Sequence, residues 1–255
     1  MGKNNRSTNR GRNNTKTIER SRLENASRKS YSKISIIIPT KVIDAYTERC
    51  VFHCSLKFPG AEIIVVPDSI VPGYPALKRN WAMQKAKGNI YAFIDSDAYP
   101  SDDWLDKALM WLEIHPAVCG PGVLPPDAPH EERIADIVYQ MLPYAYRVVP
   151  MKQRIVAEYP TFNLIVKKEV ATKFENYLTG EDSLFCRKIK RGIFYHPDIL
   201  VYHNRRPIFK KLWKQVGTYG CHRGNFIRLA LFAWVSTVCV YGINFIKGFF
   251  KRRPS

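Results

Sequence analysis

The stretch "NIYAFIDSD", residues 89–97, decides the fold, because a continuous apolar run ends there in two carboxylates, Asp95 and Asp97. Two earlier stretches have the same form, "KISIIIPT" at 33–40 and "AEIIVVPDS" at 61–69. Short, continuous runs rich in β-branched residues are typical of strands buried on both faces of a parallel sheet. The three stretches therefore predict three neighbouring parallel strands.

Helical patterns separate these strands. Residues 44–58 have helix-compatible spacing, and residues 75–88 begin with a proline and end with a glycine, as helices often do. This alternation predicts right-handed βαβ units and an α/β fold with a mostly parallel, doubly wound sheet. Ligands bind such sheets beyond the carboxyl ends of the strands. No glycine-rich phosphate loop follows the first strand, which argues against a dinucleotide-binding domain or a P-loop NTPase.

The composition points to an anionic partner. The 255 residues include 40 Lys and Arg against 22 Asp and Glu, for a formal net charge of +18. Nucleic acid, anionic lipid and phosphorylated small molecules all fit this charge. The six cysteines lack the ligand spacing of a zinc site and are expected to be buried thiols of a reducing compartment.

The two ends of the chain differ from the middle. Residues 1–32 are basic and almost without apolar content, so we expect a disordered tail that is either a solvated leader or attracted to anionic lipid or nucleic acid. Residues 207–220 form a basic amphipathic pattern that suits either a membrane interface or the protein core. Residues 229–246 carry no charge and predict a helix that spans the membrane, lies at one leaflet or is buried in the core.

The acidic stretch itself divides into two parts. In an extended segment, residues i and i+2 point the same way, so Asp95 and Asp97 can present two hard oxygen ligands to Mg²⁺ or Mn²⁺. Asp102 and Asp103 have another explanation, because Ser101 is a good N-cap and acids favour the first turn of a helix. We therefore assign Asp102 and Asp103 to the start of a helix.

Five segments, in their order and spacing, closely resemble the family 2 glycosyltransferases, which have the GT-A fold. They are "ISIIIPT", "EIIVVPDS", "LKRNWAMQKAKGNIYAFIDSDAYPSDDWL", "FNLIVKKEV" and "GEDSLFCRKIKRGIFYHPDILVYHNRR". The resemblance covers about residues 33–220 and implies transfer of a sugar, with inversion, from a nucleotide-sugar donor with the help of a divalent metal. It predicts a GT-A domain over 33–206, and the amphipathic and uncharged patterns that follow predict a membrane-associated helical segment over 207–255.

The resemblance also implies roles for single residues. Asp182, preceded by its usual neighbour Glu181, matches the catalytic base. The positions that match metal ligands are Asp95, Asp97 and His203. The positions that match the donor site are Thr40, Asp68, Arg79, Asn80 and Asp95. Without the resemblance, Asp182 reads equally as an acid at a helix N-terminus and His203 as a structural histidine.

Two departures from the family pattern qualify the match. Pro67 stands where an Asp usually precedes Asp68, so nucleoside recognition is expected to differ. Thr218 and Tyr219 replace the Arg-Trp pair that processive synthases carry, which argues against polymerising activity.

The expected function is that of a hexosyltransferase-like enzyme that uses Mn²⁺ or Mg²⁺ at the cytoplasmic face of a membrane, as in polysaccharide biosynthesis. Its acceptor would be a glycan or a lipid-linked intermediate, chosen by residues within 120–160. One alternative is a sugar-phosphate nucleotidyltransferase, although its usual glycine-rich loop is missing. The other is a non-catalytic basic protein that binds nucleic acid or membrane, which explains the tail but not the acidic motifs.

Overall fold

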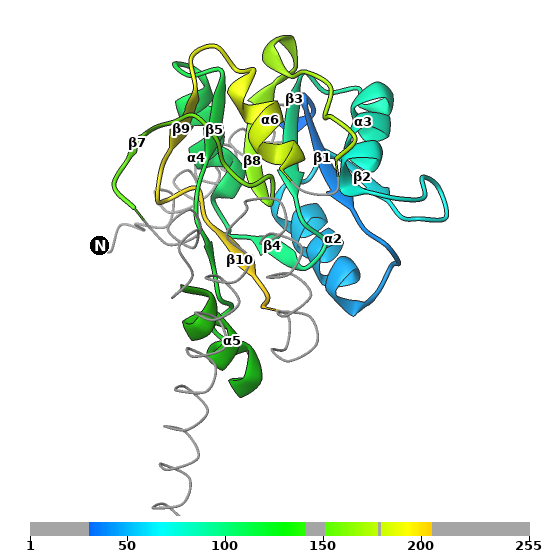
Figure 1. The fold of residues 1–255 in the computed structure, drawn as a ribbon, viewed down its shortest axis with the longest axis vertical. Coiled ribbons are helices and arrows are strands. Elements are labelled where there is room, and N and C mark those ends of the chain that lie inside the picture. The colour runs from blue at the N-terminus through cyan, green and yellow to red at the C-terminus, as the bar shows by residue number, and fades with distance from the viewer. Residues whose placement is uncertain (1–30, 141–150, 178–179, 206–255) are drawn as a thin grey trace, which may run out of the picture.

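A mixed sheet forms the centre of the computed structural model, which describes residues 31–140, 151–177 and 180–205 (Figure 1). Within these residues the sheet has seven strands in the order β2-β1-β3-β8-β5-β9-β7, and a second sheet has three in the order β4-β10-β6. Helices pack around both sheets. The predicted α/β class is confirmed.

The three apolar runs form three adjacent parallel strands, as predicted. They are β1 (Ile34–Pro39), β2 (Glu62–Val66) and β3 (Ile90–Ile94), with β1 between the other two. Every residue of β1 is buried, which explains why its sequence is apolar without alternation. The carboxyl ends of these strands therefore lie side by side.

The large sheet is mixed, because two of its seven described strands run against the other five. Strand β8 (Asn163–Lys167) lies antiparallel between β3 and β5 (Ala117–Cys119), and β7 (Arg154–Val156) lies antiparallel to β9 (Ile193–Tyr195), whereas β5 and β9 are parallel. The chain enters β8 opposite the carboxyl end of β3, where Asn163 pairs with Ile94, so it can only run back along β3. A short apolar run gives no sign of its direction.

Two helices connect the three parallel strands. Helix α2 (Ala45–Lys57) begins after Asp44, whose carboxylate accepts a hydrogen bond from the Thr47 backbone N–H at 3.0 Å. Helix α3 (Pro75–Lys85) packs on β1 and β2. The two connections run in opposite directions along the sheet, so right-handed crossovers place α2 and α3 on opposite faces.

Gly88 does not end α3, which stops three residues earlier. A Cβ atom at Gly88 would lie 2.7 Å from the Lys33 carbonyl oxygen. The glycine therefore allows the start of β3 to approach the residue before β1.

The small sheet brings the end of the described chain back to the acidic stretch. Strand β10 (Val201–His203) pairs antiparallel with β4 (Ala98–Pro100) and parallel with β6 (Gly122–Val123). His203 pairs with Ala98, and the Asn204 backbone N–H donates to the Asp97 carbonyl at 2.9 Å. This pairing fixes His203 beside Asp97.

Helix α4 (Trp104–Leu112) begins later than the sequence predicted. Its N-cap is Asp103, which forms no side-chain capping bond, and Ser101 donates to the Asp103 carboxylate instead of capping the helix. Asp102 forms an ion pair of 2.7 Å with Lys57 at the end of α2. Both acids are thus structural, but as partners of neighbouring side chains.

The remaining helices are α5 (His130–Gln140), α6 (Glu181–Arg187) and the 3₁₀ turn η2 (Lys168–Val170). Among the described residues, none of the helices has the length and hydrophobicity needed to cross a membrane. The predicted segments 207–220 and 229–246 lie outside the described residues, as do residues 1–30 of the predicted tail. Tyr31, which the sequence placed in that tail, is buried against Phe58 and donates a hydrogen bond to Asp106.

Candidate functional site

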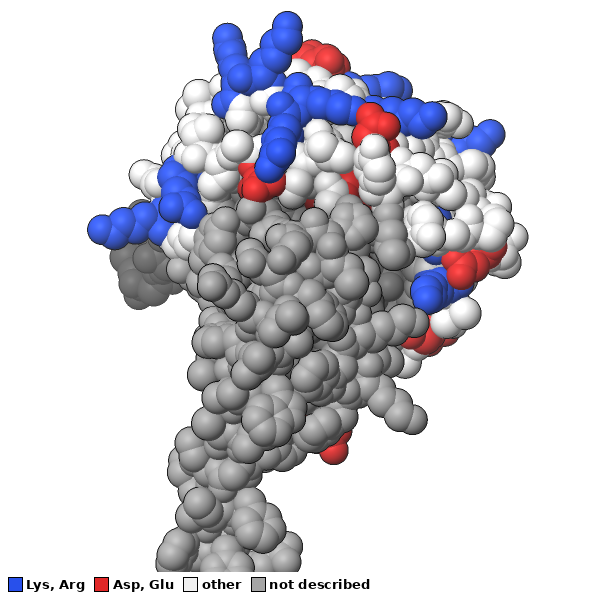
Figure 2. Space-filling view, viewed as in Figure 1, with Lys and Arg blue, Asp and Glu red and all other residues white. Residues whose placement is uncertain are grey.

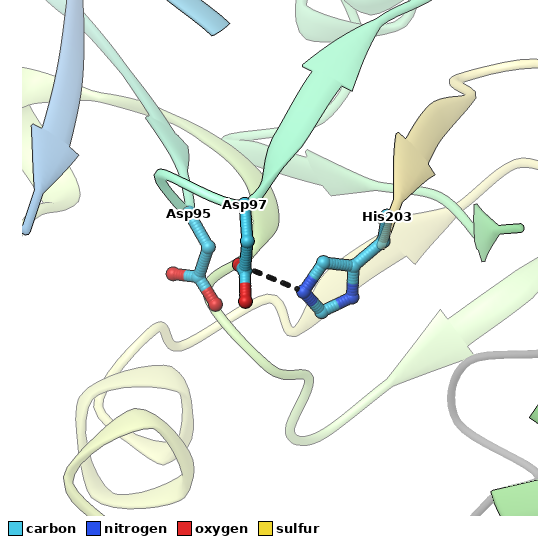
Figure 3. A group of neighbouring side chains, drawn as sticks. All are labelled: Asp95, Asp97 and His203. Carbon is cyan, nitrogen blue, oxygen red and sulfur yellow. Dashed lines mark hydrogen bonds and ion pairs between the residues drawn. The ribbon is translucent and has the colours of Figure 1, made fainter. Parts of the chain in front are cut away.

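Three side chains that could bind a metal meet where β3, β4 and β10 come together (Figure 3). Asp95 follows β3 and Asp97 precedes β4, while His203 ends β10. The His203 Nε2 atom lies 3.2 Å from the Asp97 Oδ1 atom, and one ligand atom from each residue lies within 4.8 Å of the other two. The structure therefore brings together all three positions that the resemblance implied as metal ligands.

This donor set fits a divalent cation. Mg²⁺ binds ligand oxygens at about 2.0–2.1 Å, so ligands on opposite sides of one ion lie about 4 Å apart. The separation of at most 4.8 Å needs only small side-chain adjustments to enclose an ion. Two carboxylates and one imidazole nitrogen are a donor set that can hold a divalent metal ion.

Arg79, on α3, connects this group to a second acidic pair. Its Nη2 atom lies 3.2 Å from Asp95 Oδ1, and its Nη1 atom lies 3.2 Å from Glu181 Oε1 and 3.7 Å from Asp182 Oδ1. The guanidinium is buried and lies over the Phe174 ring. One buried cation thus contacts three carboxyl groups from two distant parts of the chain.

The backbone at Gly180 positions the acidic pair at the start of α6. Its φ of 85° is left-handed, a conformation that favours glycine, and Glu181 and Asp182 follow directly in the first turn. The Thr161 backbone N–H donates to Asp182 Oδ2 at 3.1 Å, while Asp182 Oδ1 is buried. The Thr161 N–H thus contacts one carboxyl oxygen of Asp182 and the Arg79 guanidinium lies near the other, while about a quarter of the side chain (26%) stays exposed.

The two acids nearest Arg79 resist ionisation. The pKa of Glu181 is raised to about 8, chiefly by burial. Repulsion from Asp182 also raises this pKa, and the Arg79 guanidinium lowers it. Burial also raises the pKa of Asp95, with Arg79 opposing and Asp97 reinforcing the shift. At neutral pH, Glu181 is therefore largely protonated and can donate a hydrogen bond to Asp182.

Asp68 lies after β2 and is paired with a lysine that the sequence did not single out. The Lys78 Nζ atom, almost completely buried, lies 2.5 Å from Asp68 Oδ1 and 3.2 Å from the Gly73 carbonyl oxygen. The Lys78 ammonium lowers the pKa of Asp68. This pair ties the loop after β2 to α3.

Thr40 and Asn80, the other two positions implied for the donor site, are engaged within the protein. The Thr40 hydroxyl donates to the Val42 carbonyl at 2.7 Å. The Asn80 amide donates to the Phe174 carbonyl at 2.9 Å and accepts from the Phe174 N–H at 2.8 Å. Asn80 therefore holds the Phe174 segment under Arg79.

Sequence reasoning missed three residues that support the site. They are Lys78, Thr161 and Arg205, which contact Asp68, Asp182 and His203 respectively. Arg205 stands two residues after His203, and Lys78 directly precedes Arg79. A basic residue next to a predicted site residue was the available signal, but the contact of Thr161 is made by its backbone and leaves no mark in the sequence.

One known protein family matches the part of the chain that carries the centre of this site. The family model described as Glycosyl transferase family 2 matches residues 72–174, a segment that holds Arg79, Asp95 and Asp97. The resemblance to the family 2 glycosyltransferases is confirmed. The matched segment ends before Asp182 and His203, so the family model does not bear on these two residues.

Solved structures similar to this chain include the mannosyltransferase PcManGT from Pyrobaculum calidifontis in complex with GDP-Man and Mn²⁺. It is 14% identical, with a TM-score of 0.47, over 83% of this chain and 74% of that one. S. aureus TarS 1–349 in complex with UDP-GlcNAc is 14% identical, with a TM-score of 0.44, over 81% and 73%. A197 from STIV is 15% identical, with a TM-score of 0.45, over 67% and 85%. No curated protein matches the chain.

Proposed function

We propose that this protein is a metal-dependent inverting glycosyltransferase that transfers a sugar from a nucleotide-diphosphate sugar. The observation that carries the proposal is the contact of buried Arg79 with Asp95 on one side and with Glu181 and Asp182 on the other. That contact joins a candidate donor-binding group to a candidate base, as a transfer between two substrates requires.

Asp182 is the proposed base. An inverting transfer needs a carboxylate that takes the proton of the acceptor hydroxyl as that hydroxyl attacks the anomeric carbon. The hydrogen bond from the Thr161 N–H and the nearby Arg79 guanidinium orient Asp182, while the neighbouring Glu181 holds its own proton.

The donor diphosphate is the proposed leaving group, and its growing negative charge must be neutralised. Asp95, Asp97 and His203 would hold a Mn²⁺ or Mg²⁺ ion, which supplies electrostatic stabilisation of the diphosphate when bound. Thr40 and Asp68, at the carboxyl ends of β1 and β2, would lie toward the nucleoside.

We further propose a glycan or lipid-linked acceptor and a location at the cytoplasmic face of a membrane. Support comes from the sequence, in which the basic amphipathic residues 207–220 precede the uncharged residues 229–246. Such an arrangement would hold the donor site near lipid.

A thermal-shift screen tests this function. Full-length protein is heated with a panel of UDP- and GDP-sugars, each with Mn²⁺ or with EDTA, and hits are followed by measuring sugar transfer or hydrolysis. A donor that binds the folded state raises the melting temperature, and the rise should need Mn²⁺. Asp97→Ala should abolish it, whereas the matched control Asp102→Ala, whose side chain is almost fully exposed (94%), should not.

Two results would contradict the proposal. One is Mn²⁺-independent donor binding that Asp97→Ala leaves unchanged. The other is release of diphosphate from a nucleoside triphosphate and a sugar phosphate, which would indicate a nucleotidyltransferase.

A further inference from the structure

Arg205 is a buried cation two residues after the end of β10, and two acids of α5 contact it. Its Nε atom donates to Asp136 Oδ1 at 2.6 Å, and its backbone N–H donates to Glu132 Oε2 at 3.0 Å. Its Nη2 atom donates to the Gly122 carbonyl at 3.0 Å. Arg205, Glu132 and Asp136 are each less than a tenth exposed. These contacts hold the guanidinium in one orientation.

Another contact of that guanidinium reaches the candidate metal site. The Arg205 Nη1 atom lies 3.0 Å from His203 Nδ1. A guanidinium can only donate hydrogen bonds, so Nδ1 must accept one and carries no proton. The proton of the neutral ring is then on Nε2, which lies 3.2 Å from Asp97 Oδ1 and donates to it.

The opposite ring orientation would lose both contacts. Turning the imidazole by 180° would place carbon atoms opposite Arg205 and Asp97. The Phe162 ring, stacked on His203 with centroids 5.0 Å apart, fixes the plane of the imidazole. The contacts therefore select one tautomer in one orientation.

This tautomer conflicts with metal binding through Nε2. A metal ion needs a lone pair on the ligating nitrogen, and the other ring nitrogen then carries the proton. If His203 binds a metal through Nε2, Nδ1 becomes a donor and faces a guanidinium that can also only donate. The Arg205–His203 contact must therefore open before His203 can become a ligand.

We propose that Arg205 is a positioning residue that holds His203 as an Nε2–H donor to Asp97, so that His203 binds a metal ion only when the Arg205–His203 contact opens. The proposal rests on the proposed function, which places a metal at Asp95, Asp97 and His203. It also links the metal site to α5, since Glu132 and Asp136 hold Arg205. Arg205 thereby restrains metal binding, which is the reverse of what an ordinary supporting residue does.

The first test is Mn²⁺ binding measured by calorimetry on full-length protein. The variant Arg205→Met/Asp136→Leu replaces both members of the buried ion pair with apolar side chains, so that neither charge is left alone. We expect it to bind Mn²⁺ about tenfold more tightly than wild type, because no charge-assisted hydrogen bond has to break. The control Arg133→Met removes an exposed arginine from α5, the helix that carries Asp136, and should leave the Mn²⁺ affinity unchanged. Equal or weaker binding by the double variant would overturn the proposal.

The second test needs no variant of Arg205. Long-range ¹H–¹⁵N spectra of metal-free wild-type protein, with the His203 signals assigned by their loss in His203→Gln, report which ring nitrogen carries the proton. We expect the Nε2–H tautomer, and an Nδ1–H tautomer would overturn the proposal even if the double variant fails to fold. If wild-type protein does not bind Mn²⁺, the metal site of the proposed function is refuted, and so is the claim that Arg205 restrains metal binding. The spectrum still shows whether His203 Nδ1 accepts a hydrogen bond from Arg205.

Discussion

Arg79 and Glu181 are 102 residues apart in the chain, yet Nη1 of the arginine lies 3.2 Å from Oε1 of the glutamate. Arg79 comes from α3 and Glu181 opens α6, so this contact joins the two halves of the candidate site. Because the same guanidinium also binds Asp95, a shift of α6 would disturb both halves together. The relationship makes Arg79 the first residue to test.

Arg79→Lys should lower the rate of sugar transfer by about a hundredfold while leaving the fold intact. A lysine keeps the positive charge, but a single ammonium cannot reach carboxylates on both sides as the planar guanidinium does. Displacement of a catalytic group by about 1 Å is enough for a loss of this size. Transfer rates at saturating donor check the prediction.

Arg187→Lys is the matched control for that experiment, because the Arg187 side chain is exposed and forms an ion pair with Glu158, away from Arg79 and its acids. It should change the rate by less than about twofold, since exposed ion pairs contribute little. Equal losses in the two variants would contradict a specific role for Arg79.

Asp182→Asn and Glu181→Gln should differ in their effect on turnover, although the two residues are neighbours. Loss of a general base lowers the rate by about 10²–10⁴, so Asp182→Asn should reduce turnover to that extent without weakening donor binding. Glu181 is largely protonated at pH 7, and glutamine has the same shape and can make the same contacts with Arg79 and Asp182. Glu181→Gln should therefore keep turnover at pH 7 close to wild type. A large loss of turnover in Glu181→Gln would indicate that Glu181, rather than Asp182, accepts the proton of the acceptor hydroxyl.

The raised pKa of Glu181 predicts how stability depends on pH. Its folded-state pKa is about 8, against 4.5 for an ordinary glutamate, so between these values the folded protein holds a proton that the unfolded chain has released. The contribution to stability is complete below about pH 4.5 and is lost as pH rises to about 8, by at most about 1.4 kcal/mol per pH unit.

Urea unfolding of wild type and Glu181→Gln between about pH 5 and pH 8.5 checks this sign. The glutamine of the variant does not ionise in this pH range, so its free energy of unfolding should rise relative to that of wild type as pH increases. A difference that stays constant over this range would show that Glu181 is ionised in the folded protein.

The sequence predicted the strands that carry the site better than it predicted the sheet around them. The apolar runs before Thr40 and Asp95 are buried on both faces, and burial of that kind is visible in sequence, whereas the run before Asp68 forms the edge strand β2 and is mostly half-buried. The direction of β8 was not visible, because it depends on where the chain re-enters the sheet beside β3. The GT-A family pattern supplied the pairing of Asp97 with His203, which no local rule predicts.

Residues that hold the site residues were the hardest to predict. Asn80 matched a donor-site position, but its amide is used by the Phe174 backbone, a partner 94 residues away. Arg205 and Lys78 are buried cations, whereas a basic residue in a sequence usually indicates a solvated surface position. Their burial becomes visible only when Asp136 and Asp68 are seen beside them.

Lys78→Met should weaken donor binding without changing the chemical step. The buried ammonium binds both Asp68 and the Gly73 carbonyl, so it holds the loop that carries Asp68 at the carboxyl end of β2. Methionine keeps the packing of the lysine stem but releases the loop, and Asp68, at 43% exposure, can then turn to solvent. The KM for the donor should rise about tenfold with kcat little changed, which is the pattern of a lost ground-state contact. Lys85→Met, which removes an exposed lysine from the same helix, should leave both constants unchanged. A fall in kcat at constant KM in Lys78→Met would instead place Lys78 at the reacting atoms.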